Sequence, residues 1–170
     1  IKYCNDNDCK IRRAANYGIG ILAKETKRNF NSIAENIINS LQSSFGVELK
    51  GKKNEHDWGS AKDNATAALG KILKYQTSSV KLEDAYNLWL HNMPILYDES
   101  EMNEQSEILC KLIIERFEFA LGDNMKYLEI IVRIFGRIFG TEKYSDEKID
   151  GYIRDIMGNW KNNPQLMDLI

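Results

Sequence analysis

Apolar residues recur every three or four positions along almost the whole chain, which is the spacing of amphipathic helices. Alternation of apolar and polar residues, which marks a half-buried strand, nowhere extends beyond about four residues. The pattern therefore predicts an all-α chain of about seven helices joined mostly by short turns. We expect these helices over residues 9–25, 29–45, 60–75, 82–92, 98–120, 125–139 and 146–160.

Several residues mark where these helices should begin and end. Ser60 followed by Asp63 is a capping-box pattern, so we expect the third helix to start there, after a polar loop. Pro94 should end the fourth helix, because proline disfavours the helical conformation in the residue before it. Gly122 should separate the fifth helix from the sixth.

The expected core is formed by the apolar faces of the helices. On the first helix this face comprises Ile11, Ala15, Ile19 and Leu22. Trp89 and Trp160 occur at helical spacing with other apolar residues and should also be buried. The start of the fifth helix is acidic, which should stabilise the positive end of its dipole or, alternatively, attract basic segments of a partner. These acidic residues are Asp98, Glu99, Glu101 and Glu104.

The first and third helices resemble each other when the chain is shifted by 50 positions, which aligns Ala15 with Ala65 and Gly20 with Gly70. Glycine weakens an isolated helix by up to about 1 kcal/mol, so small residues here indicate a neighbouring helix that approaches closely. The odd-numbered helices are spaced close to the roughly 40 to 47 residues of HEAT and armadillo units. We expect residues 1–170 to be a segment of a longer array, with repeats over about 9–46, 60–94, 98–140 and, in part, 145–170.

Two stretches resemble the first-helix pattern of HEAT repeats. They are residues 8–20, which contain Arg12-Arg13-Ala14-Ala15 and Gly18-Ile19-Gly20, and residues 63–74, which contain Ala67-Ala68-Leu69-Gly70. Followed by Leu88-Trp89-Leu90 and Met93-Pro94-Ile95, this order resembles the C-terminal end of importin-beta (karyopherin-beta) family transport receptors, most closely the karyopherin beta-3 subgroup. The resemblance covers residues 8–122 well and the remainder as generic HEAT-like helices.

This resemblance implies a HEAT-repeat superhelix of antiparallel helix pairs that binds protein cargo for Ran-dependent transport through nuclear pores. It also implies a protein that shuttles between cytoplasm and nucleus. Nothing in the chain matches the Ran-contacting motifs of the family's N-terminal repeats, so Ran and nucleoporins are expected partners of the full-length parent. The alternative is a HEAT-repeat scaffold or regulatory subunit that organises other proteins without transport.

Composition narrows the classes of function. The 23 basic and 25 acidic residues leave a formal net charge of −2, without the general basic footprint of a nucleic-acid-binding protein. No apolar run reaches the roughly 18 residues that span a membrane. The cysteines lack the spacing of a zinc site, and neither histidine belongs to a catalytic signature. We therefore expect no enzyme activity, cofactor, metal site, direct nucleic-acid binding or membrane insertion.

Polar residues form a stripe on each even-numbered helix, opposite its apolar face. The stripe of the second helix comprises Asn31, Glu35, Asn39 and Gln42. The stripe of the fourth comprises Glu83, Asn87 and His91, and that of the sixth Lys126, Glu129, Arg133 and Arg137. Because the second helix of each HEAT pair lines the concave surface, the resemblance implies that these three polar stripes lie side by side and bind protein. The alternative is that each stripe is merely the solvated face of its helix.

Overall fold

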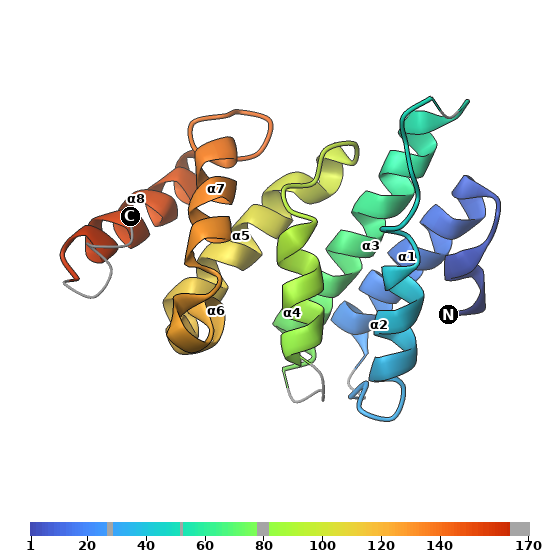
Figure 1. The fold of residues 1–170 in the computed structure, drawn as a ribbon, viewed down its shortest axis with the longest axis horizontal. Coiled ribbons are helices and arrows are strands. Elements are labelled where there is room, and N and C mark those ends of the chain that lie inside the picture. The colour runs from blue at the N-terminus through green and yellow to red at the C-terminus, as the bar shows by residue number, and fades with distance from the viewer. Residues whose placement is uncertain (27–28, 52, 78–81, 164–170) are drawn as a thin grey trace. The chain divides into compact units, whose positions relative to one another are not determined.

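The computed structural model describes residues 1–26, 29–51, 53–77 and 82–163 (Figure 1). Within these ranges the regular structure is helical and no strand occurs, which confirms the predicted all-α, HEAT-like fold class. The α-helices are α1 (Cys9–Glu25), α2 (Ala34–Gln42), α3 (Glu55–Tyr75), α4 (Leu82–His91), α5 (Glu99–Glu115), α6 (Phe117–Leu121), α7 (Leu128–Ile138) and α8 (Glu147–Lys161). Two short 3-10 helices accompany them, η1 (Lys2–Asn5) and η2 (Asp123–Met125).

The chain divides into two compact units, Ile1–Glu101 and Met102–Ile170, and the boundary falls within α5. Each unit buries large side chains of its own. Trp89 is fully buried in the first unit and Trp160 is buried in the second, as the sequence predicted. Residues 164–170, which belong to the predicted partial fourth repeat, lie outside the described residues.

Three of the predicted helices differ from the observed ones in length or continuity, and one of them, expected over 125–139, is the shorter α7. α2 is shorter than expected, because residues 31–33 and 43–46 form turns on either side of it. The fifth predicted helix is two helices, because the backbone of Arg116, at φ −140° and ψ 54°, interrupts it between α5 and α6. The seven predicted helices are thus eight in the described part of the chain.

The start of α3 was also predicted wrongly. The helix begins at Glu55, so Ser60 is not its N-cap but a buried residue within it. The Ser60 carbonyl oxygen accepts a hydrogen bond from Asn64 Nδ2 at 2.9 Å. Gly59 lets the ring of Tyr97 pack directly against this part of the helix, since a Cβ at Gly59 would lie 2.5 Å from Tyr97 Cδ2. Tertiary packing therefore extends the helix through residues that the sequence assigned to a loop.

α1 and α3 pack closely against each other along their lengths. A Cβ at Gly20 would lie 3.4 Å from the Cα of Ala68, so glycine allows the two backbones to approach. Asn16 Nδ2 of α1 also donates a hydrogen bond to the Ala61 carbonyl oxygen of α3 at 2.9 Å. This is the close approach that the small residues in both helices predicted.

The buried face of α1 differs from the predicted one. Ile19 is buried, but Ile11 is 45% and Leu22 is 60% exposed. The side chain that takes their place in the core is Arg12, which is only 7% exposed. Its guanidinium Cζ lies 5.1 Å from the centroid of the Trp58 ring, and its Nε donates to the backbone oxygen of Asp6 at 3.0 Å. The apolar pattern missed this face because a polar side chain helps to form it.

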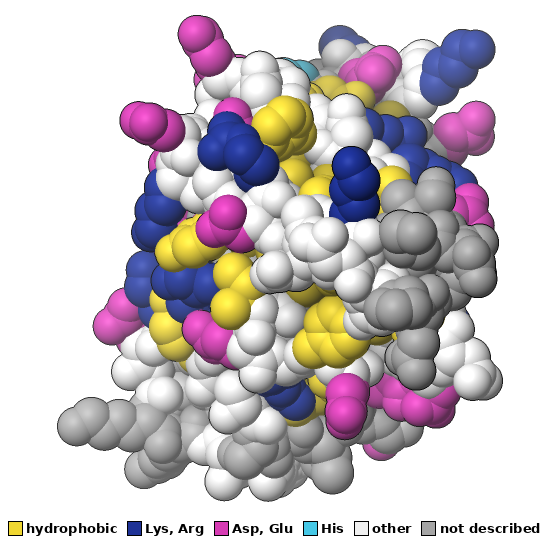
Figure 2. All heavy atoms as spheres, turned by 90° about the vertical axis from the view of Figure 1, so that its left-hand side faces the viewer, with side chains coloured by type: hydrophobic (Ala, Val, Ile, Leu, Met, Phe, Trp, Pro, Cys, Tyr) yellow, Lys and Arg dark blue, Asp and Glu magenta, His cyan; other side chains and the backbone are white. Residues whose placement is uncertain are grey.

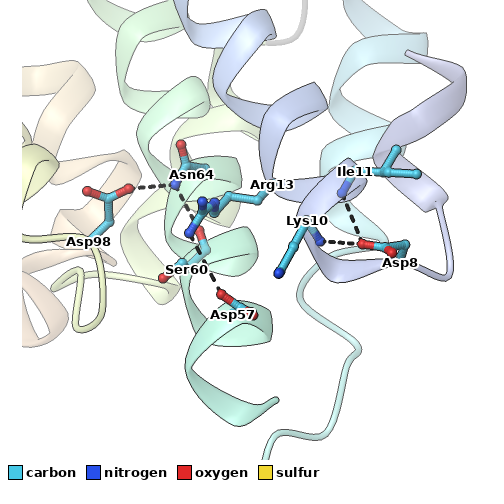
Figure 3. A network of polar contacts seen from close by, with 8 residues as sticks. All are labelled: Asp8, Lys10, Ile11, Arg13, Asp57, Ser60, Asn64 and Asp98. Carbon is cyan, nitrogen blue, oxygen red and sulfur yellow. Dashed lines mark hydrogen bonds and ion pairs between the residues drawn. The ribbon is translucent and has the colours of Figure 1, made fainter.

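Polar side chains of α3 hold the segment that connects α4 to α5. Asp63 Oδ2 accepts hydrogen bonds from the backbone N–H groups of Leu96 (3.0 Å), Tyr97 and Asp98 (2.9 Å). Asn64 donates from Nδ2 to the Asp98 carboxylate at 2.7 Å (Figure 3). Burial raises the pKa of Asp63, and the three backbone hydrogen bonds act against that rise.

Lys71 of α3 and Glu101 of α5 form a buried ion pair in the first unit. Lys71 Nζ lies 2.5 Å from Glu101 Oε1, and the two side chains are 4% and 6% exposed. The sequence predicted that Glu101 would stabilise the start of the fifth helix or attract a basic partner. Its carboxylate instead turns inward and pairs with Lys71. The other oxygen, Glu101 Oε2, has no hydrogen-bond partner among the described residues.

In the second unit, α8 is joined to α5 and α7 by polar and aromatic contacts. Glu107 Oε1 of α5 lies 2.9 Å from Lys111 Nζ on the same helix and 2.7 Å from Lys148 Nζ on α8. The rings of Phe135 on α7 and Trp160 on α8 are stacked, with their centroids 6.2 Å apart. Hydrogen bonds to the two lysines lower the pKa of Glu107 from 4.5 to about 2.

Replacing one partner of the buried ion pair should destabilise the first unit strongly. Lys71→Met leaves the Glu101 carboxylate buried without a counter-charge, for which a loss of about 3 to 5 kcal/mol is expected. The double variant Lys71→Met/Glu101→Leu removes both charges and should unfold within about 1 kcal/mol of the native protein. Urea unfolding of the three proteins measures the difference, and a double variant as unstable as the single one would contradict this account.

Acid should remove a stabilising contribution from the second unit. The folded-state pKa of Glu107 lies below the unfolded value, so its carboxylate adds stability above pH 4.5, and that stability is lost as the pH falls towards about 2. The stability difference between the native protein and Glu107→Gln should therefore shrink between pH 6 and pH 2. NMR titration of the Glu107 carboxyl carbon checks the pKa directly. A midpoint near 4.5 would contradict the lysine contacts, and Glu118→Gln in α6 serves as the exposed control.

Candidate protein-binding surface

All eleven side chains of the three polar stripes are exposed. On α2, Glu35, Asn39 and Gln42 follow one another along the helix, whereas Asn31 lies in the turn before it. Each exposed position results from packing on the opposite side, where Ile37 and Leu41 are buried. The exposed side chains of α2 therefore lie on the side of the helix away from the core of the first unit.

The stripes of α2 and α4 border a common depression, which we call the polar groove. It has a volume of about 250 Å³. Its lining consists of polar residues from both stripes, one further carboxylate and two aliphatic side chains: Glu35, Ile38, Asn39, Gln42, Asp84, Asn87 and Leu88. Four of the eleven predicted residues thus come together in one place within the first unit.

The polar groove combines negative charge with amide groups. Glu35 and Asp84 contribute carboxylates, one from each helix, and the lining contains no lysine or arginine. The side chains of Asn39, Gln42 and Asn87 can both donate and accept hydrogen bonds. Such a lining can bind a cationic side chain through the carboxylates and the backbone of an extended peptide through the amides.

Three lining residues were not predicted as part of the site. Ile38 comes from α2, whereas Asp84 and Leu88 border the groove because positions 84, 87 and 88 of α4 face it. The predicted stripe of α4 included Glu83 and His91, which are exposed but do not line the groove, and His91 Nδ1 lies 2.8 Å from the Asn87 carbonyl oxygen. The sequence did show a second carboxylate, Asp84, next to the predicted Glu83. The polar pattern alone, however, does not show which of the two faces α2.

The third polar stripe belongs to the second unit. Lys126 precedes α7, and its Nζ lies 4.9 Å from the ring centroid of Tyr127. On α7, Arg133 Nη2 pairs with Glu129 Oε1 at 2.6 Å, so part of the basic charge of this stripe is compensated within the helix. Arg137 is exposed in the last turn.

Two further observations concern other kinds of site. In the described part of the chain, no group of three or more His, Cys, Asp or Glu side chains is arranged to hold a metal ion. None of the helices described is both long and apolar enough to cross a membrane.

The fold is that of a HEAT-like helical-repeat protein, and the polar groove lies between two of its helices. Comparison with known proteins identifies a similar sequence among transport proteins. The chain is similar to importin subunit beta-3 from Saccharomyces cerevisiae, with 29% identity over 107 residues. The aligned part covers 62% of this chain and 10% of the yeast protein, so the chain spans about a tenth of that relative. No protein-family model matches the chain. The similarity supports a relationship with the importin-beta family.

Because the stripe residues are exposed, substituting them should leave the fold intact. Glu35→Lys, Asn87→Lys and Arg137→Glu should each change the free energy of unfolding by no more than about 0.5 kcal/mol. By contrast, Asn16→Ala removes a buried donor and leaves the Ala61 carbonyl oxygen without it, which should cost about 1 to 3 kcal/mol. Thermal or urea unfolding provides the measurement. A large loss for a stripe variant would assign that residue a structural role.

Proposed function

We infer that the chain is part of a nuclear import receptor related to the importin-beta family and that it binds protein cargo. The polar groove between α2 and α4 is the observation that carries this proposal, because it offers an exposed, acidic and amide-rich surface on a HEAT-like fold. The similarity to importin subunit beta-3 supports the assignment to transport. The role is one of binding and requires no catalytic group.

The chemistry of the groove suits a basic segment of cargo. The carboxylates of Glu35 and Asp84 attract lysine or arginine, while Asn39 and Asn87 hydrogen-bond to the peptide backbone. The aliphatic side chains of Ile38 and Leu88 pack against the methylene groups of the bound side chain. Charge complementarity of this kind contributes to specificity and to the association rate.

Transport itself involves the full-length protein. Ran and nucleoporins bind to it, and it shuttles between cytoplasm and nucleus. A HEAT-repeat scaffold or regulatory subunit is the competing function, since the same fold can organise other proteins without transport. The two functions are distinguished by a pull-down in which immobilised Ran, loaded with a non-hydrolysable GTP analogue, captures the full-length protein from a lysate. A transport receptor binds this form of Ran better than it binds Ran-GDP, whereas a scaffold binds neither form.

Reversing the charge of the groove should weaken the binding of a basic peptide. Glu35→Lys and Asp84→Lys each remove a charge-assisted contact worth about 1.5 to 3 kcal/mol, so each should weaken binding roughly tenfold or more. Fluorescence anisotropy with a labelled lysine- and arginine-rich peptide measures the dissociation constant. A peptide with glutamine at the basic positions should bind the native protein no better than it binds the variants.

The matched control changes the same charge outside the lining of the groove. Glu55 and Glu99 are exposed, and neither lines the polar groove. Glu55→Lys/Glu99→Lys should leave the affinity nearly unchanged. Glu101 is unsuitable for this purpose because it is buried with Lys71. Equal weakening by the control pair and the groove pair would show that only net charge matters.

A further inference from the structure

The lining of the polar groove has a definite order along the two helices that form it. Figure 1 shows α2 and α4 of the first unit running in the same direction, because each begins at the lower side of the view and rises. Glu35 lies in the first turn of α2 and Asp84 in the first turn of α4. The two carboxylates therefore lie at the same end of the groove, which we call the acidic end.

The amide groups follow further along the same two helices. Asn39 and Asn87 lie about one turn beyond the carboxylates, and Gln42 lies about one turn beyond Asn39. From Glu35 to Gln42 the axis of α2 rises by about 10 Å, which is the length of about three residues of extended chain. A groove of this length and of about 250 Å³ accommodates one long side chain together with the backbone beside it.

The acidic end attracts a cation. A helix N-terminus is equivalent to about half a positive charge, whereas each carboxylate carries a full negative one, so the two carboxylates outweigh the two helix ends. Among the described residues that line the groove, no lysine or arginine offsets them. The side of the second unit that carries α7 and α8 differs, since Figure 2 shows basic and acidic side chains interspersed there with hydrophobic ones.

Two aliphatic side chains form the middle of the groove, one from each helix. Ile38 is buried and Leu88 is half-buried, and they are adjacent in sequence to Asn39 and Asn87. A cation that lies against them exchanges part of its hydration shell for contact with carbon. The guanidinium of arginine is flat and weakly hydrated, whereas the ammonium of lysine is compact and strongly hydrated. The aliphatic pair therefore favours arginine.

The hydrogen-bond acceptors of the groove also suit a guanidinium. Each wall carries a carboxylate and an amide oxygen: Glu35 and Asn39 on α2, and Asp84 and Asn87 on α4. A guanidinium has five N–H donors spread over three nitrogen atoms in one plane, so it can donate to both walls at once. The ammonium group of lysine presents three donors around one nitrogen atom and spans a shorter distance between the walls.

We propose that the polar groove selects arginine over lysine and binds one arginine at a time. The guanidinium donates to Glu35 and Asp84 at the acidic end, and its face and methylene groups pack against Ile38 and Leu88. The backbone beside it hydrogen-bonds to the amide groups of the lining. This inference rests on the proposed function, because it specifies which basic residue of a cargo segment the groove recognises.

Three short peptides test the selection with the full chain. Each has an acetylated and amidated backbone of glycine and serine, with arginine, lysine or citrulline at its centre, and citrulline keeps nearly the shape of arginine without its charge. NMR titration, followed on the side-chain amide signals of Asn39 and Asn87, gives the dissociation constants. The arginine peptide should bind about tenfold more tightly than the lysine peptide, since one further charge-assisted hydrogen bond corresponds to at least about that factor. The citrulline peptide should bind most weakly.

Removing the carboxylate of one wall should remove the selection. In Glu35→Gln and in Asp84→Asn the ratio of the arginine and lysine affinities should fall to about one, because a single carboxylate pairs with either cation. Glu83→Gln is the matched control, since Glu83 is exposed in the same first turn of α4 but does not line the groove. It should leave the ratio unchanged. Circular dichroism should show that all three variants keep the native melting temperature.

The outcomes separate this inference from the proposed function. If the lysine peptide binds as tightly as the arginine peptide or more tightly, and both bind better than the citrulline peptide, the selection is wrong while binding of a basic segment stands. Equal affinities for all three peptides, or no binding of any, would overturn both. A ratio lowered as much by Glu83→Gln as by Asp84→Asn would show that net charge decides, and this result would also overturn the selection by the groove.

Discussion

The carboxylate of Asp63 is the contact on which the arrangement of the first unit depends. It accepts hydrogen bonds from three consecutive backbone N–H groups, those of Leu96, Tyr97 and Asp98. These donors belong to the segment in which the chain leaves α4 and enters α5, where neither helix supplies their regular hydrogen bonds. By satisfying them from α3, Asp63 fixes how the second helical pair connects to the next helix. Lys71 repeats this role nearer the end of α3 through its ion pair with Glu101.

The polar contacts that hold the first unit together from within involve other residues than the exposed stripes of α2 and α4. The polar interactions of Asn16, Asp63 and Lys71 are directed inward from α1 and α3. Glu35 and Asn87 are exposed and take no part in these three contacts. The separation of a rigid interior from an adaptable surface is typical of helical-repeat proteins, in which binding residues can change without loss of the fold.

The sequence predicted the fold class and the bounds of α1 correctly, because apolar residues recur at helical spacing through Cys9–Glu25 and along almost the whole chain. It failed where polar side chains form the core: Arg12, Lys71 and Glu101 are buried, and a hydrophobic pattern assigns such residues to the surface. The exposure of the stripe residues followed from the same pattern. Which of them meet in a groove did not, because the rotation of α4 that brings Asp84 towards α2 is set by the packing of Tyr86 and Trp89.

The distribution of the tryptophans gives each unit its own optical reporter. Trp89 is enclosed in the first unit, and Trp160, stacked on Phe135, is enclosed in the second. Trp58 lies at an intermediate depth, beneath the guanidinium of Arg12. A buried indole emits at shorter wavelength than a hydrated one, so proteins that keep a single tryptophan would reveal whether the two units melt together or one after the other.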